Sequence, residues 1–356
     1  MQISHVEVLP VELPLSLPYY SAYHPTTPVT RIEVIFIRVE TRQGRTAWGC
    51  AAFDPTLTGE SRDQVLRACR AAADRARDLN PLNTAFALAT LAPLTADTPA
   101  AQCAFDMAFH DLLGLAADLP LYRLLGGYRD RIQTAATINL APVKETVELA
   151  RDRARQGFRI LKLKGGRDPE EDVARVRAVH TALPHHLLRL DAEQGYTVRQ
   201  VRDVTRVLAG LLELLEQPLP VTADVAELAQ LTARSEVPLF ADESVKGPDS
   251  VLALASQRAV HGLSIKLATC GGLHCARQID AIARAAHLAI TVGSINEPAL
   301  LTAAGLAFAL STPGVQTTDL DGYLDLTHDP SRPRFLLEEG WLIATDVPGV
   351  GCTVEL

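Results

Sequence analysis

The fold of this chain is decided by a stretch that reads ILKLKGGRDPEEDVARVRAVHTALPHHLLRLD, residues 160–191. It begins and ends with a short apolar run closed by a charge, as expected of two strands. Between them, Asp168 is an acidic cap, Pro169 suits the first helical position and Glu171 follows the cap by three residues, which together predict the start of a helix. Such strand–helix units recur from about residue 134 to residue 319. They favour a parallel sheet with right-handed crossovers.

The successive apolar runs end at a nearly constant interval of 24 to 27 positions. Each interval has room for one strand, one loop and one helix. A closed barrel of eight strands needs about 200 residues or more, and the repeated segment is close to that limit. We therefore predict a modified TIM barrel, (β/α)7β-like, over residues 126–325. The runs end at Lys164, Asp191, Glu216, Asp242 and Lys266, and the same interval leads through Gly293 to Asp319.

The residues on either side of the repeats predict a second, α+β domain. Residues 31–40 read RIEVIFIRVE, and a Gln-Gly turn leads into a second short run, which indicates a hairpin in a small antiparallel sheet. Alanine-rich segments at 60–78 and 99–116 have helical spacing. Residues 330–356 again resemble a hairpin. We expect a capping domain over residues 1–125, the barrel over 126–325, and a C-terminal segment, 326–356, that returns to the cap.

Composition excludes several classes of protein. The chain has 356 residues, 47% of them hydrophobic, and a net charge of −8 without any basic cluster. A nucleic acid or an anionic membrane is therefore not an expected partner, because phosphate binding needs a clustered positive field. No apolar run has the length of a bilayer span, and the opening residues carry no leader pattern. The six cysteines form no C-x-x-C pair, as is typical of a reducing compartment. We expect a soluble cytoplasmic enzyme.

Three of the charges that end predicted strands are carboxylates on adjacent strands. In a barrel these ends converge on one mouth, where active sites of the fold lie. Asp191, Glu216 and Asp242 would repel one another there unless a cation neutralised them, and Mg²⁺ suits carboxylates, waters and a substrate oxygen. Zinc is disfavoured, since no His or Cys falls at these positions. A single acid after a strand is more often a helix cap, but the recurrence over consecutive units favours a metal site.

The lysines indicate acid–base chemistry at the same mouth. Lys162 and Lys164 are two positions apart, so both point to one face of their strand, here inward. Desolvation and like-charge repulsion would lower a lysine pKa from about 10.4 toward about 7–8, the range of a general base. Lys266 ends a strand nearly opposite, so two bases would face each other across a carbon acid. The alternative is a solvated edge strand with Lys164 at its rim.

These residues resemble the enolase superfamily, and within it the muconate-lactonizing-enzyme subgroup. The resemblance implies a Mg²⁺-dependent reaction in which lysine bases move the α-proton of a carboxylate through an enediolate. The matching segments are KLK at 162–164, Asp191, EQP at 216–218, ADES at 241–244, KLATCGG at 266–272 and, at the join of the two domains, residues 111–127.

Within the subgroup, the DLDG segment at residues 319–322 resembles the D-x-D of dipeptide epimerases. The resemblance implies that Asp319 and Asp321 hold the α-ammonium group of the substrate. The alternative is a polar turn after a strand, which would show the same residue pattern. GSINE at 293–297 is similar to the seventh-strand segment of the family, with Ser294 and Ile295 departing from it. The predicted substrate contacts are Asp319, Asp321, Tyr23, His24, Thr137, Ser294 and Glu297.

Two departures from the family pattern bear on specificity. The capping-domain Gly-Glu-Ala is Gly49-Cys50-Ala51 in this chain. The lid, which we define as residues 18–24 (PYYSAYH), lacks the arginine that glutamate-binding relatives are expected to place there. Its three tyrosines and one histidine suit an apolar or aromatic second residue better than an acidic one.

The sequence thus predicts an isomerase that inverts the α-carbon of a dipeptide's C-terminal residue. One Mg²⁺ per subunit would bind the three acids, Lys164 and Lys266 would exchange the proton, and Lys162 would keep Lys164 poised. We expect a homo-oligomer. The alternatives are an o-succinylbenzoate synthase or N-acylamino acid racemase, or a muconate-type cycloisomerase, of the same subgroup. A metal-free Schiff-base aldolase and a non-catalytic binding protein are further alternatives.

Overall fold

The computed structural model describes residues 1–24 and 26–356, and its first part is a three-stranded antiparallel sheet. The strand order is β1-β2-β3, and the β-branched and aromatic residues of β2 are the reason for its central place. β1 carries three prolines and pairs on one side only, as prolines in a sheet require. The bounds are β1 (Ile3–Tyr19), β2 (Val29–Thr41) and β3 (Thr46–Ala52).

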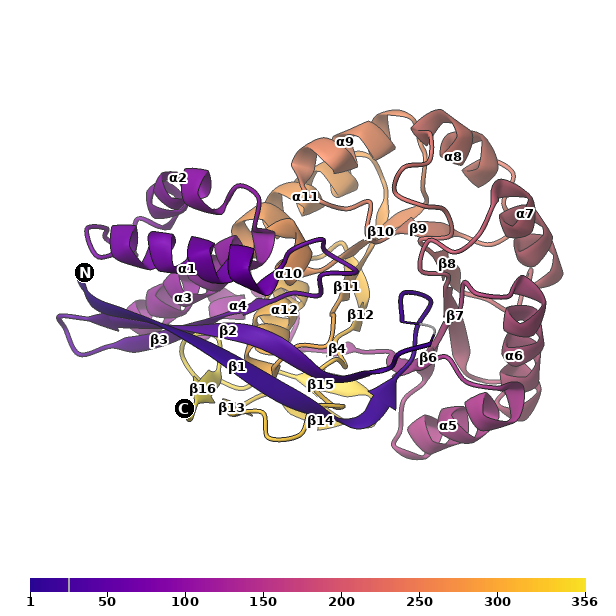
Figure 1. Cartoon of the computed structure of the whole chain (residues 1–356), viewed down its shortest axis with the longest axis horizontal. Coiled ribbons are helices and arrows are strands. Elements are labelled where there is room, and N and C mark those ends of the chain that lie inside the picture. Colours follow the sequence, from indigo (N-terminus) through magenta and orange to yellow (C-terminus); the bar gives the residue numbers. More distant parts are fainter. Residues whose placement is uncertain (25) are drawn as a thin grey trace.

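Helices cover one face of this cap sheet (Figure 1). The two predicted helical segments are confirmed as α1 (Arg62–Ala76) and α3 (Pro99–Ala117). Ser61 and Gln64 form a capping box at the start of α1, and α3 packs along β3. Two further helices, α2 (Thr84–Thr95) and α4 (Leu121–Leu124), were not predicted. Both chain termini lie on this cap side of the molecule.

Eight parallel strands form the predicted barrel, in the order β5 to β12. The ring closes where Ala135 N–H donates to Thr318 O at 2.8 Å and Thr134 bridges Thr318. Among the described residues no helix follows β12, which confirms the (β/α)7β arrangement. The strands are β5 (Ala136–Ile138), β6 (Ile160–Lys164), β7 (Leu187–Asp191), β8 (Leu214–Glu216), β9 (Leu239–Ala241), β10 (Gly262–Ile265), β11 (Ala289–Gly293) and β12 (Val315–Asp319).

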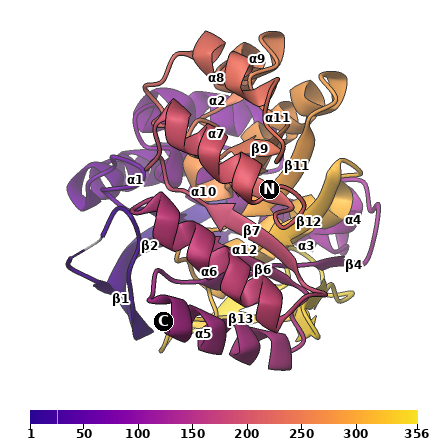
Figure 2. The same cartoon turned by 90° about the vertical axis from the view of Figure 1, so that its right-hand side faces the viewer.

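The barrel helices lie outside the strands, with α5, α6 and α7 side by side over β6 and β7 (Figure 2). The predicted helix start is confirmed, because the Asp168 carboxylate accepts the N–H groups of Glu170 and Glu171. The bounds are α5 (Val143–Arg155), α6 (Pro169–Ala182), α7 (Val198–Val207), α8 (Val225–Thr232), α9 (Pro248–Ser256), α10 (Leu267–Cys270), α11 (Leu273–Ala285) and α12 (Ala299–Ser311). None of the helices in the described ranges combines the length and apolar character that a bilayer span requires.

The C-terminal segment contacts both domains. The predicted hairpin forms from β14 (Leu336–Glu338) and β15 (Trp341–Ile343). However, β15 pairs with β4 (Arg131–Gln133), the strand just before the first barrel strand in sequence, and not with the cap sheet. Further on, the N–H of Val350 donates to the carboxylate of Asp111 on α3 at 2.8 Å. The segment therefore returns to the cap by its later residues. Two short strands, β13 (Ser331–Pro333) and β16 (Cys352–Val354), pair with each other.

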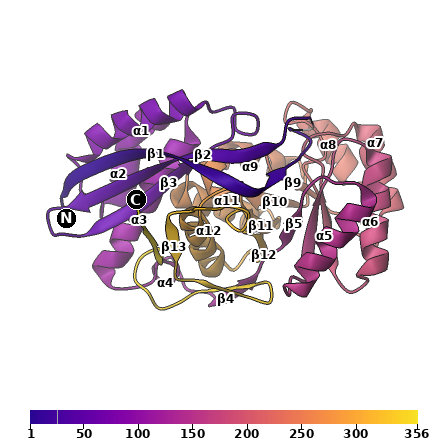
Figure 3. The same ribbon diagram turned by 60° about the horizontal axis from the view of Figure 1, so that its bottom comes forward.

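The far end of the cap sheet reaches the carboxyl end of the barrel strands. Ser16 N–H donates to Asp325 O at 2.8 Å, and Thr327 N–H donates to Pro14 O at 2.8 Å. Figure 3 shows β1 and β2 running from the cap helices toward the barrel. The lid, which follows from β1, is thereby placed over the barrel mouth.

Candidate active site

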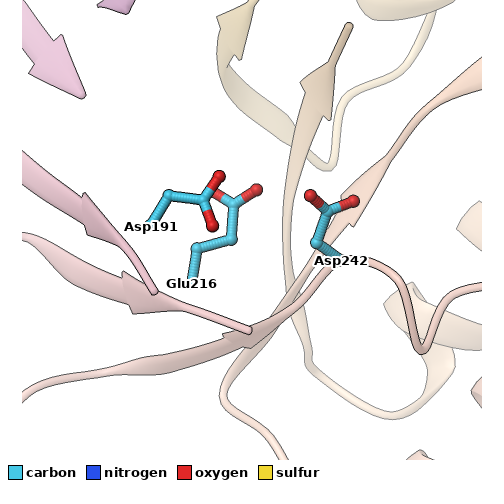
Figure 4. Close-up of side chains that lie close together, drawn as sticks. All are labelled: Asp191, Glu216 and Asp242. Atoms are coloured by element: carbon cyan, nitrogen blue, oxygen red, sulfur yellow. The ribbon is translucent and has the colours of Figure 1, made fainter. Parts of the chain in front are cut away.

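Three acidic side chains meet at the carboxyl ends of neighbouring barrel strands. Asp191 ends β7, Glu216 ends β8 and Asp242 follows β9. Each offers one carboxylate oxygen, and these oxygens lie within 4.8 Å of one another (Figure 4). All three side chains are buried. Buried acids this close repel one another, so the cluster fits a hard divalent cation with oxygen ligands.

Strand pairing and the side chain of Gln217 hold these acids in place. Asp191 and Glu216 are register partners in the β7–β8 pair. Gln217 follows with a φ of +32°, outside the common backbone regions, and turns its side chain toward the next strand. Its Oε1 accepts the N–H of Asp242 at 2.9 Å and that of Ser244 at 3.1 Å. Gln217 therefore sets the position of the third acid.

The protein's own charges leave the acid cluster short of positive charge. Burial raises the pKa of Glu216 to about 8, although Lys162 opposes this. Burial also raises the pKa of Asp242, and the nearby Glu243 carboxylate adds to the effect. Burial acts the same way on Asp191, but the ammonium groups around it outweigh burial and hold the pKa of that carboxyl below its usual range. A bound cation would stabilise the ionised form of all three acids.

Three lysines border the acids. Lys162 and Lys164 come from β6, and Lys266 follows β10, which is four strands away in the eight-stranded ring. All three line one cavity of about 280 Å³ between the barrel mouth and the cap. Their Nζ atoms lie as follows: Lys162 at 2.9 Å from Glu216 Oε1, 3.1 Å from Asp191 Oδ2 and 2.5 Å from Asp319 Oδ2; Lys164 at 3.0 Å from Asp191 Oδ2 and 2.9 Å from Glu193 Oε1; Lys266 at 2.5 Å from Asp242 Oδ2.

The expected depression of the lysine pKa values is wrong for the protein's own groups. Burial does lower the pKa of Lys164, but the carboxylates of Asp191 and Glu193 outweigh burial and raise it well above its usual value. The same balance raises the pKa of Lys162 and of Lys266. The expectation weighed repulsion between two lysines and did not count the acids that surround each one.

The two aspartates of the D-x-D segment reach the same cavity by different contacts. Asp319 ends β12, and its carboxylate forms an ion pair with the Lys162 ammonium group. Asp321 accepts the N–H of Thr137 at 2.5 Å and its hydroxyl at 3.1 Å. Burial and the Asp319 charge raise the pKa of Asp321 to about 7. The Oδ1 of Asp319 is buried without a partner in the described structure, so this wall of the cavity has acceptor capacity for a cationic group.

The other predicted substrate contacts fall into two groups. Tyr23, His24, Thr137 and Ser294 line the cavity. Glu297 does not: it is buried behind the cavity wall, where its carboxylate accepts the Thr302 hydroxyl at 3.3 Å. Burial raises the pKa of Glu297 to about 8.

Both departures from the family pattern lie in the cap, but only the lid lines the cavity. Cys50, which replaces the family's glutamate, is buried, and burial together with the Glu297 carboxylate raises the pKa of its thiol. The lid has no arginine, but Arg31 on β2 lines the cavity and pairs with the exposed Glu12 at 3.0 Å. A positive charge is therefore present beside the lid, although not within it.

Sequence reasoning missed the residues that join the lid to the barrel. Glu193 and Gln194 follow β7 in consecutive left-handed conformations, with φ of +44° and +66°. Glu243 follows the third acid, and its Oε1 accepts the Tyr23 hydroxyl at 2.9 Å. The available signal was the run Glu193-Gln194-Gly195 directly after a predicted strand end, because strained or glycine-rich turns there often carry function.

Comparison with known proteins places this architecture in a family. The profile "Mandelate racemase / muconate lactonizing enzyme, N-terminal domain" matches residues 4–126, and the profile "Enolase C-terminal domain-like" matches residues 145–355. An L-Lys-D/L-Arg epimerase of Methylococcus capsulatus is 35% identical to this chain over 99% of both proteins.

Solved structures agree with these matches. A dipeptide epimerase of Enterococcus faecalis, complexed with Mg and the dipeptide L-Leu-L-Tyr, is similar at a TM-score of 0.95 and 29% identity, covering 99% of this chain and all of the other. A substrate-liganded L-Ala-D/L-Glu epimerase of Bacillus subtilis gives a TM-score of 0.95 at 30% identity, covering both chains fully. The chain therefore belongs to the enolase superfamily, in its muconate lactonizing enzyme subgroup, with dipeptide epimerases among its relatives.

Proposed function

We propose that this protein is a Mg²⁺-dependent dipeptide epimerase that inverts the α-carbon of the C-terminal residue. One observation carries the proposal: Lys164 and Lys266 line one cavity from opposite strands of the barrel, beside a triad of buried acids. The full-length similarity to proteins named as dipeptide epimerases supports it.

The acid triad holds the cation in this proposal. Asp191, Glu216 and Asp242 supply oxygen ligands only, which suits Mg²⁺. When bound, Mg²⁺ supplies positive charge that stabilises the substrate carboxylate as the α-proton leaves. The same charge would offset the carboxylates that raise the pKa of the lysines, and would move those lysines toward the range of a general base.

The two lysines carry out the proton transfer. Lys164 removes the α-proton on one face of the substrate, and Lys266 returns a proton on the other face, so the stereocentre inverts. The assignment rests on their places in the ring, because β6 and β10 are separated by half of its strands. Lys162 lies deeper, among Asp191, Glu216 and Asp319, and acts by fixing the charge balance beside Lys164.

The side of the cavity formed by Asp319 and Asp321, here called the D-x-D wall, selects a substrate with a free amino group. Asp321 is held by Thr137 and Asp319 by Lys162, so both carboxylates are fixed before substrate arrives. Two fixed acids attract the α-ammonium group of a dipeptide. Substrates of a cycloisomerase or an o-succinylbenzoate synthase carry no such group, so this wall favours the epimerase over those alternatives.

Three finer expectations stay predictions. The aromatic lid favours an apolar or aromatic C-terminal side chain. We also expect a cytoplasmic enzyme and a homo-oligomer, for which light scattering after size-exclusion chromatography is the direct measurement.

A dipeptide screen in D₂O tests the proposal. The enzyme is incubated with L,L-dipeptides and Mg²⁺, and mass spectrometry follows deuterium at the α-carbon while chiral chromatography follows the diastereomer. We expect deuterium only in the C-terminal residue, an L,D product, and loss of both when EDTA removes the metal. Exchange in the N-terminal residue, or activity that survives EDTA, would contradict the proposal.

A further inference from the structure

The loop between β7 and α7 has an unusual backbone. Glu193 and Gln194, neither of them glycine, adopt left-handed φ values of +44° and +66° in succession. Such conformations are costly for residues with a Cβ and persist only where surrounding contacts impose them. The loop also packs tightly on the loop that follows Lys164, since a Cβ at Gly195 would lie 1.9 Å from Gly166 O. The two loops are therefore held as one unit.

The strained conformation turns the Glu193 side chain between a base and the lid. Its Oε1 lies 2.9 Å from Lys164 Nζ and accepts the Tyr19 hydroxyl at 3.4 Å. Its Oε2 accepts the N–H of Ala22 in the lid at 2.5 Å. The residue is buried, so these contacts are not screened by solvent. One carboxylate thus contacts Lys164 and two positions of the lid.

A second set of contacts holds the lid without touching Lys164. The Tyr23 hydroxyl donates to Glu243 Oε1 at 2.9 Å and accepts from Gln194 Nε2 at 2.7 Å. Gln194 Oε1 in turn accepts the N–H of Val221 at 2.9 Å. Tyr23 therefore offers an internal control, because it fastens the same lid through a different carboxylate.

The geometry points to Glu193 as a positioning residue that couples the seating of the lid to the orientation of Lys164. When the lid lies on the barrel, Ala22 and Tyr19 fix the carboxylate, and the carboxylate fixes the Lys164 ammonium group on its face of the cavity. Within the described residues, Lys266 forms neither a hydrogen bond nor an ion pair with the lid; its ion pair is with Asp242. The assignment of Lys164 as a base rests on the proposed function, whereas the contact between Glu193 and the lid does not.

The matched variants are Glu193→Ala, Glu193→Gln and Tyr23→Phe. Glu193→Ala removes both the lid acceptor and the ion pair. Glu193→Gln keeps an acceptor for Ala22 and loses the charge beside Lys164. Tyr23→Phe loosens the lid and leaves Glu193 in place. Calorimetric Mg²⁺ binding verifies that each variant retains the metal site, since the Glu193 N–H donates to the Asp191 carboxylate.

Two readouts do not depend on turnover. Hydrogen–deuterium exchange of the peptide that covers residues 18–24 reports the seating of the lid, and labelling by an amine-reactive ester, quantified by mass spectrometry, reports the freedom of Lys164. We expect Glu193→Ala to speed lid exchange and to raise labelling of Lys164, with labelling of Lys266 unchanged. Glu193→Gln should raise Lys164 labelling while the lid stays protected. Unchanged lid exchange or unchanged Lys164 labelling in Glu193→Ala would overturn the inference.

A third readout separates the two faces of the reaction. α-Proton exchange in D₂O is measured from the L,L and from the L,D dipeptide. Glu193→Ala should lower exchange on the Lys164 face at least tenfold more than on the Lys266 face, whereas Tyr23→Phe should raise KM and affect both faces equally. Equal losses on both faces in Glu193→Ala would contradict the coupling. If the unmodified protein exchanges no α-proton, the proposed function fails, and the lid and labelling results still decide the inference.

Discussion

The two sides of the cavity hold their lysines in different ways. Lys164 pairs with two carboxylates, Asp191 and Glu193, one of which also contacts the lid. Lys266 pairs with Asp242 and stands at the start of a short helix that leads into a Gly-Gly turn. Lys164 is thus tied through Glu193 to the lid, and Lys266 to the wall of the barrel. We expect this difference to make the two proposed half-reactions separable by mutation.

The loops behind the two lysines differ in their anchors as well. On the Lys164 side, the Asp172 carboxylate accepts the N–H of Gly166 at 2.8 Å, the hydroxyl of Tyr196 and the guanidinium of Arg175. On the Lys266 side, Asp106 of cap helix α3 accepts the N–H of Leu273 and pairs with His110. The first anchor lies within the barrel, and the second joins the barrel to the cap.

Removal of either lysine should have the largest effect. We expect Lys164→Ala and Lys266→Ala each to lower the epimerisation rate by about 10³-fold or more, because a positioned general acid–base contributes about 10²–10⁴-fold and inversion needs both. Each variant should still exchange the α-proton of one diastereomer, and the retained diastereomer should differ between the two. Exchange in D₂O from each pure diastereomer measures this. If both variants still exchange the α-proton of the same diastereomer, the two lysines do not stand on opposite faces of the substrate.

The next largest difference is expected in the free energy of unfolding when each loop anchor, Asp172 or Asp106, is replaced. Asp172→Asn leaves the buried Arg175 without its charge partner, and breaking such a pair costs about 3–5 kcal/mol. Asp106→Asn keeps an acceptor for Leu273, and His110 can lose its proton, so a loss of about 1–2 kcal/mol is expected at pH 8. Denaturant unfolding of both variants at pH 8 measures the difference. Equal losses would show that the two anchors are equivalent.

The D-x-D wall should discriminate by the substrate's amino group. Asp321→Asn should raise KM for a free dipeptide about tenfold, since a hydrogen bond to a charged group contributes about 1.5–3 kcal/mol. The same variant should treat the N-acetylated dipeptide as the unmodified enzyme does, because that substrate has no ammonium group. Steady-state kinetics with both substrates are the measurement. A parallel loss with both would remove Asp321 from amine recognition.

The last comparison concerns the pH dependence of stability and the buried carboxyl of Glu297, behind the Lys266 side of the cavity. Burial raises the pKa of Glu297 from 4.5 to about 8, so the folded protein holds this proton more tightly than the unfolded chain. Its contribution to stability is full below pH 4.5, falls between pH 4.5 and 8, and is lost above. Glu297→Gln should therefore reduce the decline of unfolding free energy with pH by about 1.4 kcal/mol per pH unit in this window.

Unfolding at pH 5.5, 6.5 and 7.5 checks the Glu297 prediction. Glu355→Gln, an exposed control, should keep the original slope. An unchanged slope in Glu297→Gln would mean that the carboxyl is ionised in the folded protein.

The sequence predicted the barrel and the acid triad because both follow from periodicity. Parallel strands place their carboxyl ends at one mouth, so charges that recur once per unit must meet there, as Asp191 and Glu216 do in register. The cap sheet was likewise predicted from the β-branched run at residues 31–40, which lies within β2.

Contacts that depend on loop conformation were not predictable in this way. Glu193 and Glu243 do not stand at the recurring strand-end positions. The contacts of Glu193 depend on its left-handed backbone and on the lid, and the contact of Glu243 depends on Tyr23 of the lid. Glu297 was assigned to the cavity from the family segment, but the turn after β11 buries it behind the wall. The direction of the lysine pKa shifts was predicted wrongly, because it depends on how many carboxylates surround each ammonium group in space.

The proposed reaction requires one cation and one substrate carbon between the two lysines. Crystals grown with Mn²⁺ in place of Mg²⁺ and with a slowly reacting dipeptide test it directly, because Mn²⁺ is located by its anomalous scattering. We expect one peak that contacts an oxygen of Asp191, of Glu216 and of Asp242. The C-terminal α-carbon should lie between Lys164 Nζ and Lys266 Nζ, which approach it from opposite faces. A peak away from the three acids, or both amines on one face of that carbon, would contradict it.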